Sequence, residues 1–401
     1  MVNRSRTGCS SQVSMIPKRY YLTLLSMGMI LCAQAFIAHR TWNYVRGRPH
    51  LERRWKIGVS VCGLLLLATL LSLLGFTEWL PRTPVLVTQT LVNFFGLTSI
   101  ASVGIYLAMQ GAMAQLPSSF QGERREALRT IAKAAVVSPV VVMGFGTFVE
   151  RTNFEVRECD IAIRNLPVQM EGMRLLLLSD IHLGAFLSVK TLARVIDQSN
   201  ELKAHVAFMT GDLISSAKDP LDDCLLQLSR LRSDWGTFGC LGNHEVYAEA
   251  ENYTAVQGKK LGIRFLRGEA QVLDIGGTSL NVAGVDYQPF EQRSRYLQGS
   301  ASLVRPGAVN VLLSHNPDVF PAAAARGYDL MLAGHTHGGQ ITFEILSPVL
   351  NPARILTPFV RGLYSNGASS CYVTRGIGTL GVPTRLGARP EISLLRLKRL
   401  A

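Results

Sequence analysis

The sequence predicts a protein in two unlike parts, an α-helical membrane region over residues 1–150 and an α+β domain over residues 151–401. Apolar residues make up 48% of the 401-residue chain and charged residues only 17%, a balance that excludes disorder and favours lipid contact for part of the chain. Long uncharged segments lie before residue 150. After it, short apolar runs alternate with Gly, Asp, Asn and Pro, which is typical of an α/β or α+β domain.

Four segments of the first part are candidates for membrane spans. Residues 20–38 and 57–77 contain no charge, and each is about as long as a helix that crosses ~30 Å of hydrocarbon. Residues 85–109 are the most apolar part of a third uncharged stretch. Residues 130–149 are interrupted by Lys133 and Pro139, so a fourth span, a signal anchor and a helix at the membrane surface all remain open. The sequence thus predicts three or four transmembrane helices.

The net charge of +13 is concentrated in this membrane part. Residues 1–150 contain 15 Lys and Arg against 5 Asp and Glu, whereas residues 151–401 contain 26 against 23. Basic residues between apolar segments are typical of loops on one side of a membrane, so the bilayer and not a nucleic acid is the expected partner.

The expected location is the cell membrane, the inner one where there are two. The distribution of the same basic residues predicts the orientation of the protein in that membrane. If four segments cross, one side carries five Lys and Arg and the other side ten. The positive-inside rule then places the C-terminal domain outside the cytoplasm. If the fourth segment does not cross, the side of that domain is reversed relative to the loops.

Five apolar runs of the second part each end in a cluster of polar residues. Functional groups of open sheets gather where strands end and loops begin, so these clusters are expected to lie together. The runs and their clusters are residues 175–178 with Ser179-Asp180-Ile181-His182, 206–209 with Thr210-Gly211-Asp212, 238–241 with Gly242-Asn243-His244-Glu245, 309–313 with Ser314-His315-Asn316-Pro317, and 330–333 with Gly334-His335-Thr336-His337-Gly338-Gly339-Gln340.

The histidines strengthen this prediction. Eight occur in the chain, six of them after residue 151, and five of those six stand in the clusters. His39, His50 and His205 are interpreted as structural. Carboxylate, imidazole and amide donors without a thiolate suit two divalent ions of Mn, Fe or Zn better than a structural zinc site. The seven cysteines form no CxxC pair and are interpreted as small buried residues.

The ordered clusters resemble the calcineurin-like metallophosphoesterase superfamily, whose motifs are D-x-H, G-D, G-N-H-[DE], H and G-H-x-H, and most closely its bacterial membrane-associated branch. The resemblance covers about residues 174–340. It implies a four-layer αββα sandwich with two metals at the strand ends. By motif position it implies Asp180, His182 and His337 as ligands of the first metal, Asn243, His315 and His335 as ligands of the second, Asp212 as the bridge, and His244 beside the metals without binding them.

Two departures narrow the resemblance. Ser215 stands where purple acid phosphatases carry a tyrosine ligand, which disfavours an iron-tyrosinate site. The stretch after Gly211-Asp212 lacks the arginine with which serine/threonine protein phosphatases hold a phosphoprotein.

The resulting prediction is a membrane-anchored, metal-dependent phosphoric ester hydrolase, preferentially a phosphodiesterase or pyrophosphate-type hydrolase. A hydroxide bridging both metals would attack phosphorus while His244 assists the leaving group. A phosphomonoesterase and a non-catalytic membrane scaffold or sensor are the alternatives. A lipid-linked phosphoester is one candidate substrate, although a cytoplasmic lipid precursor would require the opposite topology.

Four further charged side chains have more than one interpretation in the sequence. Arg385 and Arg389 are interpreted as solvated or salt-bridged rather than as phosphate contacts. Glu245 is interpreted as a supporting carboxylate and not as a ligand. Asp286 is compatible with a turn and with the edge of the site.

Overall fold

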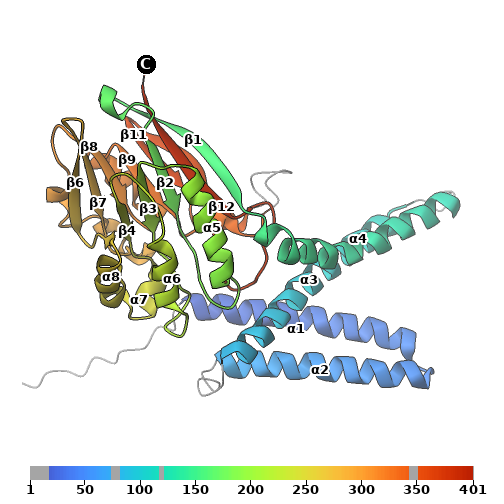
Figure 1. The fold of residues 1–401 in the computed structure, drawn as a ribbon. Coiled ribbons are helices and arrows are strands. Elements are labelled where there is room, and N and C mark those ends of the chain that lie inside the picture. The colour runs from blue at the N-terminus through green and yellow to red at the C-terminus, as the bar shows by residue number, and fades with distance from the viewer. Residues whose placement is uncertain (1–17, 74–81, 117–121, 343–350, 401) are drawn as a thin grey trace, which may run out of the picture. The chain divides into compact units, whose positions relative to one another are not determined.

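The computed structural model describes residues 18–73, 82–116, 122–342 and 351–400. The chain divides into two compact units (Figure 1). One unit comprises Met1–Glu78 and Leu91–Val141, and the other comprises Trp79–Thr90 and Val142–Ala401. The second unit therefore begins before the expected domain boundary at residue 150, within a helix.

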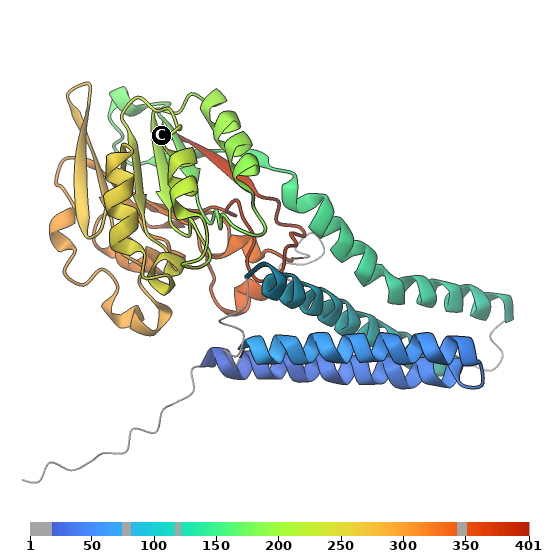
Figure 2. The same cartoon turned by 60° about the horizontal axis from the view of Figure 1, so that its bottom comes forward.

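Long helices build the N-terminal part of the described chain. They are α1 (Lys18–Val45), α2 (Pro49–Leu73), α3 (Arg82–Ala114) and α4 (Gly122–Phe148). Figure 2 shows α1 and α2, both blue, as neighbouring antiparallel helices. Their contact includes Trp42 and Trp55, whose ring centroids are 4.8 Å apart. On α1, the Gln34 amide donates to Ser99 Oγ of α3 over 2.7 Å, so this polar residue connects two helices.

Three of these helices are long and apolar enough to cross a membrane by length and composition. They are Pro49–Leu71, Val87–Ala114 and Gly122–Thr152. Large apolar side chains along them, such as Leu64 and Phe95, are exposed, as expected of surfaces that face lipid. The segment 130–149 is part of the continuous helix α4 despite Pro139. The segment 20–38 lies within α1, and its crossing of the membrane stays a prediction.

Two mixed six-stranded sheets form the second unit. The first sheet has the order β1-β12-β2-β3-β4-β5 and the second the order β10-β11-β9-β8-β7-β6. Neighbours are parallel except for β12 with β2, β10 with β11 and β6 with β7. The strands are β1 (Glu155–Ile163), β2 (Arg174–Leu178), β3 (Val206–Thr210), β4 (Thr237–Cys240), β5 (Ile263–Phe265), β6 (Glu269–Ile275), β7 (Thr278–Gly284), β8 (Val309–Leu313), β9 (Leu330–Ala333), β10 (Gly362–Asn366), β11 (Ser369–Val373) and β12 (Glu391–Arg399).

Side-chain alternation along the strands assigns each apolar residue to one of the packed layers. Leu175 and Leu177 of β2 pack between the two sheets, in a cluster that also contains Val311 of β8. Leu176 and Leu178 point the other way, into a cluster with α5 (Val189–Glu201), α6 (Leu221–Leu228) and α8 (Glu251–Lys260) (Figure 1).

The outer face of the second sheet is also covered. Leu312 of β8 and Met331 of β9 pack there against Phe320 and Ala323 of α9 (Phe320–Ala325). Helices therefore lie outside both sheets, and the predicted αββα sandwich is confirmed.

The last turns of α4 belong to this second unit. A Cβ on Gly146 would lie 2.6 Å from the carbonyl oxygen of Arg385, so only glycine permits this approach. The hydroxyls of Thr147 and Thr384 are 2.6 Å apart. The backbone N–H of Gly387 donates to Glu150 Oε1 over 2.8 Å. The loop before β12 is thereby fixed to the end of a candidate membrane helix.

Candidate metal centre

The strand ends deliver the predicted polar residues to one place. Asp180 and His182 follow β2, Asp212 follows β3, and His315 follows β8. Asn243 and His244 begin α7 (Asn243–Tyr247) directly after β4, and His335 and His337 follow β9. Because β2 to β4 are parallel, and β7 to β9 are parallel, the carboxyl ends within each set share one edge of a sheet.

The donor atoms form overlapping groups. Three groups have all donor atoms within 4.8 Å of one another: Asp180, His182 and His337; His182, Asp212 and His244; and Asp212, His315 and His335. His337 Nε2 lies 3.4 Å from Asp180 Oδ1, and His182 Nε2 lies 3.1 Å from His337 Nε2. Asp212 Oδ2 lies 3.2 Å from His315 Nε2 and 3.6 Å from His182 Nε2. Asp212 thus stands between two sets of imidazoles.

Several of these residues have a left-handed backbone, which is costly for residues other than glycine and is typical of functional sites. The loops after β3 and β4 approach each other closely at Gly211. A Cβ there would lie 2.3 Å from the amide nitrogen of Gly242, so this approach requires glycine. The residues with positive φ are Asp180 (49°), His182 (47°), Asp212 (55°), His335 (73°) and His337 (51°).

Asn243 tests whether these residues fit a metal. Its Oδ1 is buried and has no hydrogen-bond partner among the described residues. A buried amide oxygen without a partner costs about 1–3 kcal/mol, a cost that a cation at this position would remove. Two imidazole nitrogens, His315 Nε2 and His335 Nδ1, also lie 3.1 Å apart. The His and Asp clusters together fit a binuclear metal site.

Burial and neighbouring charges control the protonation of the ligands. Burial lowers the pKa of His182 and of His335 to about 3, so both rings keep a lone pair at neutral pH. Burial raises the pKa of Asp180 to about 6. Burial also disfavours charge on Asp212 and His315, but their mutual attraction outweighs it. This attraction lowers the pKa of Asp212 below its usual value and raises that of His315 to about 9.

The comparisons with known proteins agree with this geometry. The family model of the calcineurin-like phosphoesterase matches residues 173–339. These residues form a calcineurin-like phosphoesterase domain.

Relatives of this chain occur in bacteria and in vertebrates. A Bos taurus "Transmembrane protein with metallophosphoesterase domain" is 26% identical over 95% of this chain and 89% of its own length. An uncharacterized metallophosphoesterase of Campylobacter jejuni is 31% identical over 61% of this chain and 63% of its own length. Phosphodiesterase YaeI of Escherichia coli is 28% identical over 56% of this chain and 82% of its own length. The similarity to the Bos taurus protein includes the N-terminal helices.

Beside the candidate metal-binding residues, Glu245 holds the loops after β3 and β4. Its buried carboxylate accepts from the backbone N–H groups of Asp212 (2.9 Å), Leu213 (2.7 Å) and Gly242 (2.7 Å). The interpretation of Glu245 as a supporting carboxylate is confirmed.

His244 is oriented by its surroundings. Its Nδ1 lies 2.8 Å from the carbonyl oxygen of Ser215, to which it donates. Its backbone N–H donates to Asp212 Oδ1 over 2.9 Å, and its ring centroid lies 4.8 Å from that of His182. The Ser215 bond leaves Nε2 as the ring nitrogen that can reach a substrate.

Arg385 differs from the sequence interpretation. The side chain is fully buried and therefore not solvated. Its guanidinium donates to the carbonyl oxygens of Arg375 (2.7 Å), Ala388 (3.1 Å) and His337 (3.3 Å), and also to those of Gly376 and Gly378. The reason is that the segment after β9 and the segment between β11 and β12 turn these carbonyls toward one buried position. The carbonyls of His337 and Gly376 accept a backbone N–H as well, so the guanidinium adds a second hydrogen bond to each. Arg389 remains at the surface and binds Asn153.

Two residues after β7 complete the surroundings. Asp286 accepts from Arg267 at 2.8 and 3.0 Å, so it is a salt-bridged residue and not a ligand. Sequence reasoning missed Tyr287, whose ring centroid lies 6.0 Å from that of His315 and 5.7 Å from that of His335. Its position just past a parallel strand is the same signal that marked the five clusters.

Proposed function

We propose that this protein is a membrane-anchored phosphohydrolase that uses two divalent metal ions to cleave a phosphodiester or a pyrophosphate. The observation that supports it most directly is the position of Asp212 between two donor groups, with its Oδ2 3.6 Å from His182 Nε2 of one group and 3.2 Å from His315 Nε2 of the other. A single structural metal would need only one such group. The bond to be cleaved would therefore lie at the joint edge of the two sheets.

The ligand roles follow the grouping of the side chains. Asp180, His182 and His337 would hold one ion, and Asn243, His315 and His335 the other. Asp212 would bind both, because a carboxylate offers two anionic oxygens. When bound, two such ions supply positive charge for the phosphoryl oxygens and acidify the attacking water. The ions are expected to be Mn, Fe or Zn, since the proposed donors contain no thiolate.

His244 would act on the leaving group. With Nδ1 donating to the Ser215 carbonyl, the protonated ring presents Nε2–H to the leaving oxygen and transfers that proton as the P–O bond breaks. Glu245 fixes the backbone of Asp212 and of Gly242, which precedes α7, so it positions His244 relative to Asp212 without touching the substrate.

A diester is favoured over a monoester by two observations. Arg385 donates to backbone carbonyls, so it does not supply the cation that would favour a doubly charged monoester. A relative of 28% identity carries the name of a phosphodiesterase. A substrate at the membrane, including a lipid-linked one, fits the apolar helices.

The test uses the purified full-length protein in detergent with Mn²⁺. We expect hydrolysis of bis-p-nitrophenyl phosphate to exceed that of p-nitrophenyl phosphate. Asp212→Asn and His244→Ala should each lower kcat by about a hundredfold or more. A His205→Gln control should keep full activity, because that ring lies outside the metal cluster. Faster monoester turnover would favour the phosphomonoesterase, and no turnover of either substrate would favour the scaffold or sensor.

A further inference from the structure

A cavity of about 370 Å³ opens beside the metal centre. Its wall includes His335, a proposed ligand of the second metal, and Tyr287, whose ring packs against His335 and His315. The cavity therefore adjoins the metal centre at His335, and Tyr287 contacts both His335 and His315 from the cavity wall. This volume is within the range of small-molecule sites.

Apolar side chains form much of the wall. Tyr287, Phe290, Pro317, Ala353 and Leu356 contribute rings or hydrocarbon surface. Phe290 is 52% exposed and Leu356 is 71% exposed, so both present apolar surface at the cavity. Both would lose contact with water if a hydrocarbon group lay between them.

The polar side chains of the wall already have partners. The Asn316 amide donates to the carbonyl of Gln288 (2.7 Å) and to the Tyr296 hydroxyl (3.0 Å). The Asp318 carboxylate accepts from Arg293 at 2.8 Å and from the Thr357 hydroxyl. These groups therefore need no polar ligand, and the remaining free surface of the cavity is mainly apolar.

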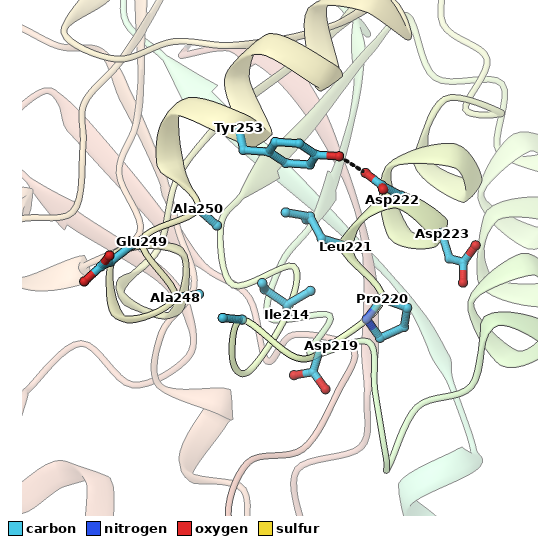
Figure 3. A pocket seen from close by; sticks show the side chains of 11 residues that line it. Ile214, Asp219, Pro220, Leu221, Asp222, Asp223, Ala248, Glu249, Ala250 and Tyr253 are labelled. Carbon is cyan, nitrogen blue, oxygen red and sulfur yellow. Dashed lines mark hydrogen bonds between the residues drawn. The ribbon is translucent and has the colours of Figure 1, made fainter. Parts of the chain in front are cut away.

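A second cavity offers a contrast. It has a volume of about 650 Å³, and Figure 3 shows carboxylates on its wall. Tyr253 donates to one of them, Asp222, over 2.8 Å, and Asp219, Asp223 and Glu249 supply further negative charge. These carboxylates would repel a phosphate ester. The cavity beside His335 is therefore the better place for part of the substrate.

We infer that the cavity beside His335 binds a hydrocarbon ester group of the substrate, so that the natural phosphoester carries an alkyl chain. This inference rests on the proposed function, since the chain is positioned by a phosphoryl group at the metals. A hydrocarbon occupant also explains why an apolar wall adjoins a site built from charged and imidazole groups. Each methylene that enters the cavity should strengthen binding by about three- to fourfold.

The experiment measures the binding of methyl, butyl and hexyl phosphate to the full-length, Mn²⁺-loaded protein by calorimetry in detergent. Inhibition of bis-p-nitrophenyl phosphate hydrolysis by the same three compounds provides the second readout. We expect Kd and the inhibition constant to fall with chain length, by about thirtyfold or more from methyl to hexyl. Similar constants for all three compounds would overturn the inference.

A matched pair of variants locates the effect. Ala353→Phe places a ring in the cavity and should reduce the methyl-to-hexyl difference to less than about threefold. Ile355→Phe makes a comparable change two residues away, at a side chain that is 86% exposed and outside the wall, and should keep the full difference. A chain-length dependence that Ala353→Phe leaves intact would place the hydrocarbon elsewhere, in the detergent for example, and would also overturn the inference.

The outcomes separate this inference from the proposed function. Diester turnover without chain-length dependence would remove the hydrocarbon site and leave the phosphohydrolase standing. Loss of both turnover and Mn²⁺-dependent binding of methyl phosphate would remove the function, and the inference with it.

Discussion

Asp212 shows how much of the site depends on single residues. Its carboxylate faces His182 and His315, accepts the backbone N–H of His244, and its own backbone N–H is held by Glu245. Its φ of 55° is maintained by these contacts at an energetic cost of order 1–3 kcal/mol. The surrounding structure therefore holds Asp212 in a strained conformation that suits binding and not stability.

The Asp212–His315 pair predicts how metal binding responds to pH. In the metal-free protein Asp212 raises the pKa of His315 to about 9, so the ring is protonated at neutral pH and must lose that proton to bind a metal. The proton competes with the metal below pH 9, and affinity should rise with pH. Calorimetry should give a Kd for Mn²⁺ at the site that contains His315 about tenfold lower at pH 8 than at pH 7, with one proton released as that site fills. Equal affinity at both pH values would contradict the assignment.

Arg385 predicts a large effect from a conservative change. Burial lowers its pKa to about 10, so it is still charged at neutral pH, and its forked guanidinium reaches carbonyls that one ammonium cannot reach together. Arg385→Lys should lower the free energy of unfolding by about 3 kcal/mol or more, measured by denaturant titration in detergent. Arg389→Lys, at an exposed side chain, should cost less than about 1 kcal/mol. Similar costs for both variants would argue against the special role of Arg385.

Among the elements, helix α4 combines a candidate membrane span with a packing contact to the second unit. Its composition allows it to cross a membrane, and its last turns pack against the loop that carries Thr384 and Arg385. Arg385 in turn donates to the carbonyl of His337. A connected set of contacts therefore runs from the end of α4 to a proposed metal ligand.

Two glycines of α4 test this connection. A methyl group at Gly146 would lie 2.6 Å from the Arg385 carbonyl oxygen, so Gly146→Ala must displace the loop and should cost about 1–3 kcal/mol of stability. Gly144 has nothing within 4 Å of the added Cβ, so Gly144→Ala is the matched control and should change stability by less than about 1 kcal/mol. We also expect weaker Mn²⁺ binding in the first variant only. Unchanged metal affinity in Gly146→Ala would show that the two regions are independent.

At the scale of the whole molecule, the apolar helices predict where the protein resides. We expect it to stay with the membrane through a high-salt or alkaline wash and to be released by detergent, because three helices have the length and composition of membrane spans. If the positive-inside count holds, added protease should digest the catalytic domain in right-side-out vesicles and spare it in inside-out vesicles. The opposite pattern would reverse the topology and bring cytoplasmic lipid precursors into consideration.

The sequence by itself determined the two-part organisation and the sets of residues at the strand ends. Apolar segments of membrane length and strands with period-two burial are local patterns, and a polar residue that follows a parallel strand reaches the sheet edge wherever that strand lies in the sheet. Asp180, His182, Asp212, His315 and His337 were predictable for this reason.

Only the tertiary structure decided what surrounds those residues. Arg385 donates to carbonyls from as far away in sequence as His337, and Tyr287 of the loop after β7 packs against His315 and His335. The cavity beside His335 likewise combines the loop after β7 with the segment around Ala353. Such contacts depend on how segments that are distant in sequence pack against each other, so local composition and periodicity do not predict them.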